Sequence, residues 1–315
     1  MISVVTAYYN RKKLFTRTLD SMMPHYGTID FEVIVVDDGS DEHERLEDLE
    51  GRYPFLRVIR LEKQQKWYKN PCIPFNIGFS EAKGEKIILQ NPECYHLDAI
   101  LPYVDKHLVD NTYLSFACYS LDKENTDNED LFADKNHIRN TIASNDYAMK
   151  MDGELGWYNH SVHRPAAFHF CAALMYKDLF DLGGFDPRYA WGVGFDDNEF
   201  LWRIQQKGMH IRFADDIVVL HQNHYKFTAA NHKDFIEDKS KQYVYNSNVL
   251  QHITETGLLW RVNYLNNPHQ EMRFENTARE EFIRSMNRYV TQISKYKYAR
   301  QLMMLGTKIC SKLKF

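Results

Sequence analysis

The sequence predicts an α/β protein with a doubly wound, mostly parallel sheet and flanking helices, followed by a C-terminal helical appendage. Short apolar, β-branched runs alternate with helix-like segments at the spacing of βαβ units. Several of the runs are apolar throughout, as in parallel strands that are buried on both faces. Ligands bind such sheets at the carboxyl ends of the strands, so the functional residues are expected there.

The first ninety residues contain four of the expected strands, which span 2–7, 31–36, 56–61 and 86–89. Residues 11–23 are expected to form a helix, with Asn10 as its N-cap. A charged helix is expected after Ser40. Another helix should span 74–83, because Gly84 just past its end suits a helix C-terminus.

The second half continues the alternation of strands and helices. A strand is expected at 168–175 and a short helix at 176–182. An amphipathic helix should follow Asn198 and end near Gly208. A last apolar strand then leads to His221.

Composition narrows the class of protein. The 315 residues are 44% hydrophobic and 26% charged, as in an ordinary soluble globular chain. A net charge of −4 argues against a nucleic-acid binder that relies on bulk charge. The five cysteines are odd in number and form no CxxC pair, so reduced thiols are expected. We expect a cytoplasmic protein, because neither a signal peptide nor a membrane-spanning stretch is recognisable.

The most unusual stretch is 183–200, which begins with a glycine pair, runs through aromatic residues and ends in acidic ones. Asp196 and Asp197 fall at the start of the helix expected after Asn198, where Asp is a common N-cap. One cap needs one Asp, however, and here two stand beside Glu199. The excess favours a general base with supporting carboxylates.

Polar residues also stand at the ends of three expected strands, in the segments 7–10, 37–40 and 91–93. No GxGxxG motif follows the first strand, so a dinucleotide-binding Rossmann site is not expected. Carboxylates take the place of glycines, and they repel a diphosphate unless a divalent cation lies between them. Asp and Gly are ordinary turn residues, but turns alone do not account for three such strand ends. The pattern indicates a metal–nucleotide ligand.

Three segments together resemble a family 2 glycosyltransferase of the GT-A fold. They read VVTAYYNR at 4–11, VVDDGS at 35–40 and GGFDPRYAWGVGFDDNEF at 183–200. The resemblance covers about residues 1–225, and the order of the three motifs is more specific than any one of them. It implies an inverting enzyme that uses a divalent cation and a nucleotide-diphospho sugar, with a UDP-sugar as the expected donor.

The resemblance also implies roles for single residues. Asp38, the second Asp of the DDGS motif, would contact the nucleotide base, and Ala7 and Tyr9 would flank it. The acidic pair that ends the third motif supplies the catalytic base in the family, usually through its second member. Asp197 is therefore the expected base, with Asp196 as the next choice.

One departure from the family concerns the DxD motif that binds metal and ribose. Its place is filled by Asn91-Pro92-Glu93. Asn91 still suits a ribose hydroxyl, and Glu93 keeps one carboxylate for a cation. His221 resembles a late His that ligates metal in related enzymes, and the spacing to His224 supports it. An imidazole ligand favours Mn²⁺ over Mg²⁺.

An alternative remains open for the diphosphate. The departure from DxD is also consistent with a metal-independent enzyme, in which cationic side chains such as Lys69 or Arg164 screen the charge. Trp191 suits stacking on a sugar face as well as packing in the core.

The chain is expected to divide into a catalytic domain at 1–225 and a helical extension at 226–315. The polar stretch at 121–145 is too long for an ordinary connection, so an insertion or lid near the acceptor side is expected. The end, 295–315, has the pattern of a basic amphipathic helix. Such a helix docks on protein or lies on the inner face of a membrane, and the peripheral membrane contact is the second expectation.

The expected reaction moves a sugar to a hydroxyl of a glycan or glycolipid acceptor, with inversion. The alternative is a non-catalytic nucleotide-sugar or glycan-binding module that has lost its DxD motif. It is disfavoured because the acidic cluster at 196–199 is intact. A nucleotidyltransferase would require a basic, Gly-rich phosphate loop near the first strand, and the sequence has none.

Overall fold

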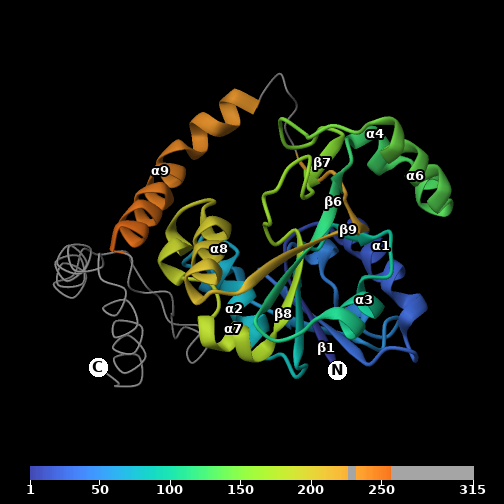
Figure 1. Ribbon diagram of the computed structural model, residues 1–315, viewed down its shortest axis with the longest axis horizontal. Helices are drawn as coiled ribbons and strands as arrows, with labels where there is room; N and C mark the ends of the chain where they lie inside the picture. The colour runs from blue at the N-terminus through green and yellow to red at the C-terminus, as the bar shows by residue number, and fades with distance from the viewer. Residues whose placement is uncertain (226–231, 257–315) are drawn as a thin grey trace.

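The computed structural model describes residues 1–225 and 232–256 (Figure 1). Within these ranges the strands are β1 Ile2–Tyr8, β2 Phe31–Asp37, β3 Leu56–Arg60, β4 Lys86–Gln90, β5 Cys94–His96, β6 Thr112–Ser120, β7 Gly156–Asn159, β8 Cys171–Met175 and β9 His210–His221. The helices are α1 Lys12–Met22, α2 Cys72–Ser80, α3 Ile100–His107, α4 Lys123–Asp127, α5 Glu129–Ala133, α6 Lys135–Ser144, α7 Tyr176–Leu182, α8 Asp196–Lys207 and α9 His232–Thr256. Short 3₁₀ turns are η1 Met23–His25, η2 Glu42–Glu44, η3 Glu47–Leu49, η4 Lys63–Gln65 and η5 Pro187–Trp191.

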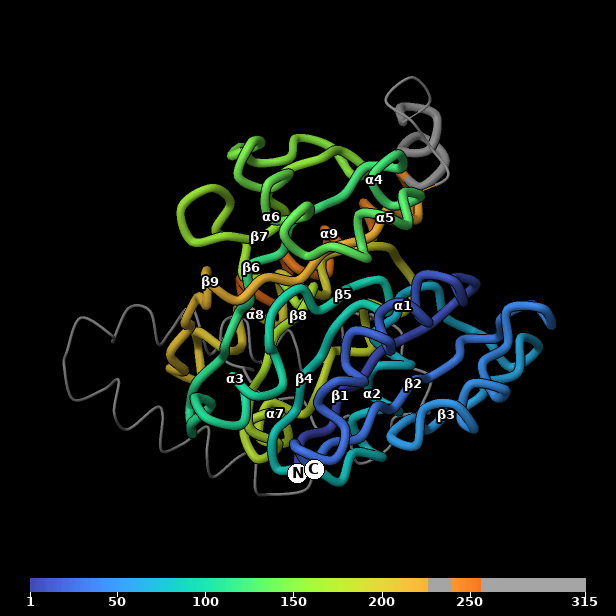
Figure 2. The backbone as a smooth tube through the Cα atoms, turned by 90° about the vertical axis from the view of Figure 1, so that its right-hand side faces the viewer, coloured from blue at the N-terminus to red at the C-terminus, as the bar shows by residue number. Residues whose placement is uncertain are grey.

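All the described strands belong to one sheet with the order β3-β2-β1-β4-β8-β6-β9-β5, and β7 pairs with β6. Strands β1 to β4 are parallel to one another, and Figure 2 shows β3, β2, β1 and β4 side by side. Strand β8 is antiparallel to β4 and β6, and β9 runs parallel to β6. Six of the nine described strands therefore point the same way, and the mostly parallel sheet predicted from the sequence is confirmed.

Helices cover both faces of the sheet because successive side chains of a strand point to opposite faces. Val4 of β1 lies in one apolar cluster with Leu19 of α1 and Ile100 of α3. Its neighbour Val5 lies in a second cluster, on the other face, with Phe75 of α2. All five side chains are buried, and each contributes about 1.5–3 kcal/mol to stability. The sheet is doubly wound, as the sequence predicts.

The region after Ser40 does not form the charged helix predicted from the sequence. It contains the two 3₁₀ turns η2 and η3 instead. Its acidic side chains bind other elements: the Glu44 carboxylate accepts the Lys12 N–H at 2.7 Å, and Glu47 pairs with Arg60. A continuous helix would turn these carboxylates away from their partners.

The predicted N-cap of α1 is also wrong. Asn10 has a left-handed backbone with φ 47°, and its side chain exchanges two hydrogen bonds with Asp41, at 2.8 and 2.9 Å. The helix begins at Lys12, whose N–H is satisfied by Glu44 from the next βα loop. A distant carboxylate thus replaces the local cap.

The polar stretch at 121–145 folds into α4, α5 and α6 beside one end of the sheet (Figure 1). Leu131 and Ile138 are fully buried in an apolar cluster with residues of β6 and β9. Arg17 of α1 reaches this region, donating to the Thr126 carbonyl at 3.0 Å and pairing with Glu129 at 2.9 Å. The stretch is therefore fastened both to the sheet and to α1.

Helix α9 lies beyond the expected domain boundary at 225 and packs against α8 and η5 (Figure 1). In the part of the chain that the structure describes, no helix is both long and apolar enough to cross a bilayer. The basic stretch at 295–315, on which the predicted membrane contact rests, lies outside the described residues.

Candidate active site

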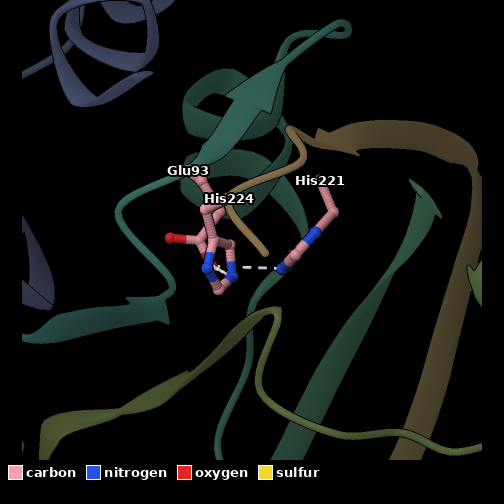
Figure 3. A group of neighbouring side chains, drawn as sticks. All are labelled: Glu93, His221 and His224. Carbon is pink, nitrogen blue, oxygen red and sulfur yellow. Dashed lines mark ion pairs between the residues drawn. The ribbon is translucent and has the colours of Figure 1, made fainter. Parts of the chain in front are cut away.

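A buried cluster of one carboxylate and two imidazoles lies at the carboxyl edge of the sheet (Figure 3). Oxygen Oε1 of Glu93 is 3.1 Å from Nε2 of His221 and 3.1 Å from Nε2 of His224. The pairing of β5 with β9 sets Cys94 opposite His221, so the residue before Cys94 lies beside the end of β9. The structure thus brings together the two metal ligands expected from the sequence and adds His224.

The cluster fits a divalent cation. Ligand atoms about 2.1 Å from an octahedral ion lie about 3.0 Å from one another, which is close to the distances from Glu93 to the two histidines. Glu93 and His221 are each 1% exposed, and the other ring nitrogen of His221 is buried without a partner. One carboxylate oxygen with two imidazole nitrogens suits Mn²⁺ better than Mg²⁺.

Electrostatics favour the protonation states of Glu93 and His224 that a cation requires. Burial alone would raise the pKa of Glu93, but Arg11 and the two histidines outweigh it and hold the pKa well below its usual range. The Arg11 guanidinium lies 2.6 Å from the second carboxylate oxygen. Burial lowers the pKa of His224 despite the attraction of Glu93. Glu93 is therefore anionic and His224 neutral near pH 7, and both are ligand forms.

The turn after β9 is held from several sides. The buried Gln222 side chain donates to the Glu93 carbonyl at 3.0 Å and accepts from Arg17 at 2.8 Å. The next N–H, that of Asn223, donates to the Thr126 hydroxyl at 2.8 Å. Because Thr126 belongs to α4, the polar stretch at 121–145 supports the turn that carries the two histidines.

A second group of ionisable side chains lies at the start of α8. Asp196 and Asp197 are the first two residues of the helix, as predicted, and the preceding Phe195 has a left-handed backbone with φ 66°. The Asn70 amide donates to Asp196 Oδ1 at 2.8 Å. Nδ1 of His169 forms a close ion pair with Asp197 Oδ1.

The two aspartates have different environments. Asp196 is 6% exposed, and burial together with its neighbour Asp197 raises its pKa to about 6. The Asp197 side chain is 28% exposed and accessible to a substrate. Burial would lower the pKa of His169, but its attraction to Asp197 prevails and raises the pKa. The ion pair with Asp197 therefore favours the protonated form of the His169 ring.

The third acidic residue of the stretch has a structural role. Glu199 is 1% exposed, and its carboxylate binds the guanidinium of Arg203 at 2.5 and 2.8 Å. Arg203 also donates to the Leu182 carbonyl at 2.8 Å, which joins α8 to the end of α7. The sequence predicts that Glu199 supports the two aspartates, but its carboxylate pairs with Arg203 instead.

The residues expected to hold the nucleotide base gather at the ends of β1 and β2. The Asp38 N–H donates to the Tyr8 carbonyl at 2.8 Å, beside Ala7 and Tyr9. The Asp38 carboxylate accepts from Tyr68 at 2.6 Å and from Lys66. Burial raises the pKa of Asp38, against the opposing effect of Lys66. Tyr9 is 39% exposed and offers a ring at this edge.

Two short segments connect these groups. Residues 66–70 carry the partners of Asp38 and, through Asn70, the partner of Asp196. His169 binds Asp197, while its neighbour Phe170 accepts the Asn91 N–H at 3.0 Å and packs edge-on against the His221 ring. The residues predicted to bind the nucleotide base, the ribose and the metal therefore lie along one edge of the sheet.

Some site residues have no signal in the local sequence. His169 lies 28 positions before Asp197, just ahead of β8, and only the fold brings the two side chains together. Arg11 stands in a recognisable motif, but its contact with Glu93 is made across 82 residues. The spacing to His221 is the one local feature that points to His224.

Comparisons with known proteins bear on the family of the chain. The family profile described as Glycosyl transferase family 2 matches residues 3–175. Chondroitin synthase of Escherichia coli is 26% identical in an alignment over 244 residues, and the match covers 70% of this chain and 34% of that protein. The chain thus spans about a third of the length of this curated relative.

Solved structures show more distant likenesses. A mannosyltransferase from Pyrobaculum calidifontis, in complex with GDP-Man and Mn²⁺, has a TM-score of 0.49 and 16% identity, covering 99% of this chain and 81% of that one. S. aureus TarS 1–349 in complex with UDP-GlcNAc has a TM-score of 0.48 and 18% identity, covering 78% of this chain and 66% of that one. At these scores neither assigns a ligand to this chain.

Proposed function

The chain belongs to glycosyl transferase family 2, and we propose that it is an inverting glycosyltransferase that moves a sugar from a nucleotide-diphospho sugar, expected to be a UDP-sugar, to a hydroxyl of a glycan or glycolipid. The observation that carries the proposal is the buried cluster of Glu93, His221 and His224 at the carboxyl edge of the sheet. A cation there would meet the diphosphate of a donor whose base lies against Asp38.

Each group along the edge has a part in holding the donor. Ala7 and Tyr9 flank the base, the Asp38 carboxylate accepts from its polar edge, and the Asn91 amide faces the ribose. Glu93 and the two histidines would hold the cation. When bound, the cation neutralises charge that develops on the departing diphosphate.

Asp197 is the proposed catalytic base. Its exposed carboxylate accepts the proton of the acceptor hydroxyl, whose oxygen then forms the bond to the anomeric carbon as the bond to the diphosphate breaks. His169 holds the carboxylate in place through the ion pair. One displacement with one base inverts the anomeric configuration.

The test is a screen of nucleotide sugars with the full chain and Mn²⁺, with release of nucleoside diphosphate as the readout. Candidate acceptors are polysaccharide fragments, which the name of the chondroitin synthase relative supports as a class. We expect one donor to be consumed, faster with its acceptor. Donor binding without any consumption would favour the non-catalytic binding module instead.

A further inference from the structure

Helix α9 covers the turn that leads into the acidic pair, Asp196 and Asp197. Residues 192–195 connect η5 to α8, and they run beneath residues 242–246 of α9. Figure 1 shows α9 alongside α8, although α8 ends at Lys207 and α9 begins only at His232. The contacts lie directly before Asp196, so α9 influences where the acidic pair is placed.

Asn246 makes the most specific of these contacts. Its side chain is fully buried, and its amide nitrogen donates to the Gly194 carbonyl at 2.7 Å and to the Tyr189 carbonyl at 3.2 Å. One side chain therefore satisfies a carbonyl on each side of Gly192. A backbone link supplements it, because the Val193 N–H donates to the Gln242 carbonyl at 3.4 Å. The side-chain amide of Asn246 thus links the end of η5 to the turn that follows it.

The turn has no room for a side chain at the bridge. A Cβ added at Gly192 would lie 2.1 Å from Oδ1 of Asn246 and 2.6 Å from the Gln242 carbonyl oxygen. Distances this short require one of the two backbones to shift. Gly192 thus permits the close approach of α9 that the Asn246 hydrogen bonds need.

The last residue of the turn is strained and is held by a second contact. Phe195 has φ 66°, a conformation that costs a residue with a side chain about 1–2 kcal/mol. Its ring packs against the ring of Tyr243, with 4.6 Å between centroids. Its carbonyl accepts the Glu199 N–H at 3.0 Å, which begins the hydrogen bonds of α8. The strained residue therefore fixes the direction in which the helix, and Asp197 with it, starts.

We propose that α9 contributes to the catalytic site. In this proposal Asn246 is a positioning residue, because it holds the turn that precedes Asp197. The role of Asn246 in catalysis rests on the proposed function, whereas the contacts by which α9 fixes the turn at 192–195 do not. The expected domain boundary at 225 would then separate the base from the helix that positions it.

The first test removes the bridge. Asn246→Ala should lower kcat by about 10- to 100-fold, since displacing a catalytic group by about 1 Å has effects of this size. The affinity for nucleoside diphosphate, measured by calorimetry, should change less than about twofold because the described side-chain partners of Asp38 and Glu93 belong to other parts of the chain. The matched control is Gln251→Ala, on the exposed side of the same helix, which should behave as the parent.

A second pair of variants keeps the test valid if loss of a buried amide unfolds the protein. Tyr243 is 51% exposed, so Tyr243→Ala should fold while losing the ring contact to Phe195. We expect kcat to fall several-fold in Tyr243→Ala and to stay at the parent value in Tyr243→Phe, which keeps the ring. If the substitutions acted only by lowering overall stability, the kcat of the folded protein would be the same in Tyr243→Ala and Tyr243→Phe.

A readout without turnover separates this proposal from the proposed function. With 5-fluorotryptophan incorporated, the ¹⁹F resonance of Trp191, next to Gly192, should move in Asn246→Ala and Tyr243→Ala. The resonance of Trp157, on β7, should stay in place. A parent chain that consumes no donor would refute the proposed function and leave this comparison intact. Folded variants with the parent kcat and an unmoved Trp191 resonance would overturn the role of α9.

Discussion

The two adjacent aspartates at the start of α8 differ in their solvent exposure and in the residues that they contact. Asp197 is 28% exposed and paired with His169, while Asp196 is buried and bonded to Asn70. Solvent, and with it an acceptor hydroxyl, therefore has easier access to Asp197 than to Asp196. This difference assigns the proposed proton transfer to Asp197 and a supporting place to Asp196.

Asp197→Asn keeps the shape of the side chain and removes its ability to take a proton. We expect turnover to fall by about 10²–10⁴, with the affinity for nucleoside diphosphate nearly unchanged. Steady-state kinetics and calorimetry check the two expectations. The control is Asn198→Ala on the exposed side of the same turn. Turnover close to that of the parent would refute Asp197 as the base.

Asp196 should make stability depend on pH. Its folded pKa of about 6 lies above the ordinary value, so the protonated form favours the fold. That contribution is fully present below about pH 4 and is lost as pH rises through about 6. Asp197 and His169 are the charged groups beside it.

Asp196→Asn stays neutral at every pH. Relative to the parent, we expect it to raise the free energy of unfolding by up to about 3 kcal/mol at pH 8, and to change it little below pH 4. Urea unfolding at the two pH values measures the difference. An equal change at both would show that the carboxyl does not titrate as its burial requires.

At the scale of elements, α8 is anchored by an ion pair that has no catalytic part. Glu199 and Arg203 lie one turn apart on its inner face, and Arg203 also binds the last turn of α7. These buried charges stabilise the fold only while both are present, because either alone would be left unpaired in an apolar environment.

Arg203→Met should therefore lower the free energy of unfolding by about 3–5 kcal/mol, the cost of leaving one buried charge unpaired. Thermal or urea unfolding measures it. The matched control is Lys123→Ala, which removes an exposed pair with Asp127 and should cost less than about 0.5 kcal/mol. Equal losses in the two variants would contradict the role given to the buried pair.

Elements with regular apolar patterns are the ones that the sequence predicts well. The first strands, the helix at Tyr176–Leu182 and the end of α8 appear where the patterns place them, whereas α8 begins slightly earlier than expected, at Asp196. The charged region after Ser40 is mispredicted because its carboxylates bind partners on α1 and β3, and such partners are not visible locally. Local propensity is a weak guide where side chains act across elements.

At the scale of the whole molecule, the sheet explains how residues far apart in sequence form one edge. Parallel strands bring residues near 8, 37 and 90 to the same side, which the sequence predicts. The antiparallel pairing of β5 with β9 adds the turn at 221–224, and the segment just before β8 adds His169. Neither antiparallel pairing has a sequence signature, so the partners of Glu93 and Asp197 emerge only from the fold.

The central claim is that this edge binds a nucleotide-diphospho sugar through a cation held by Glu93, His221 and His224. The most direct measurement is donor consumption by the full chain in excess chelator, followed by titration with Mn²⁺ and with Mg²⁺. We predict that activity disappears in chelator and returns with either ion, at a lower concentration of Mn²⁺ because two ligands are imidazoles. Full activity in chelator would contradict the claim and leave Glu93 as a contact for ribose or acceptor.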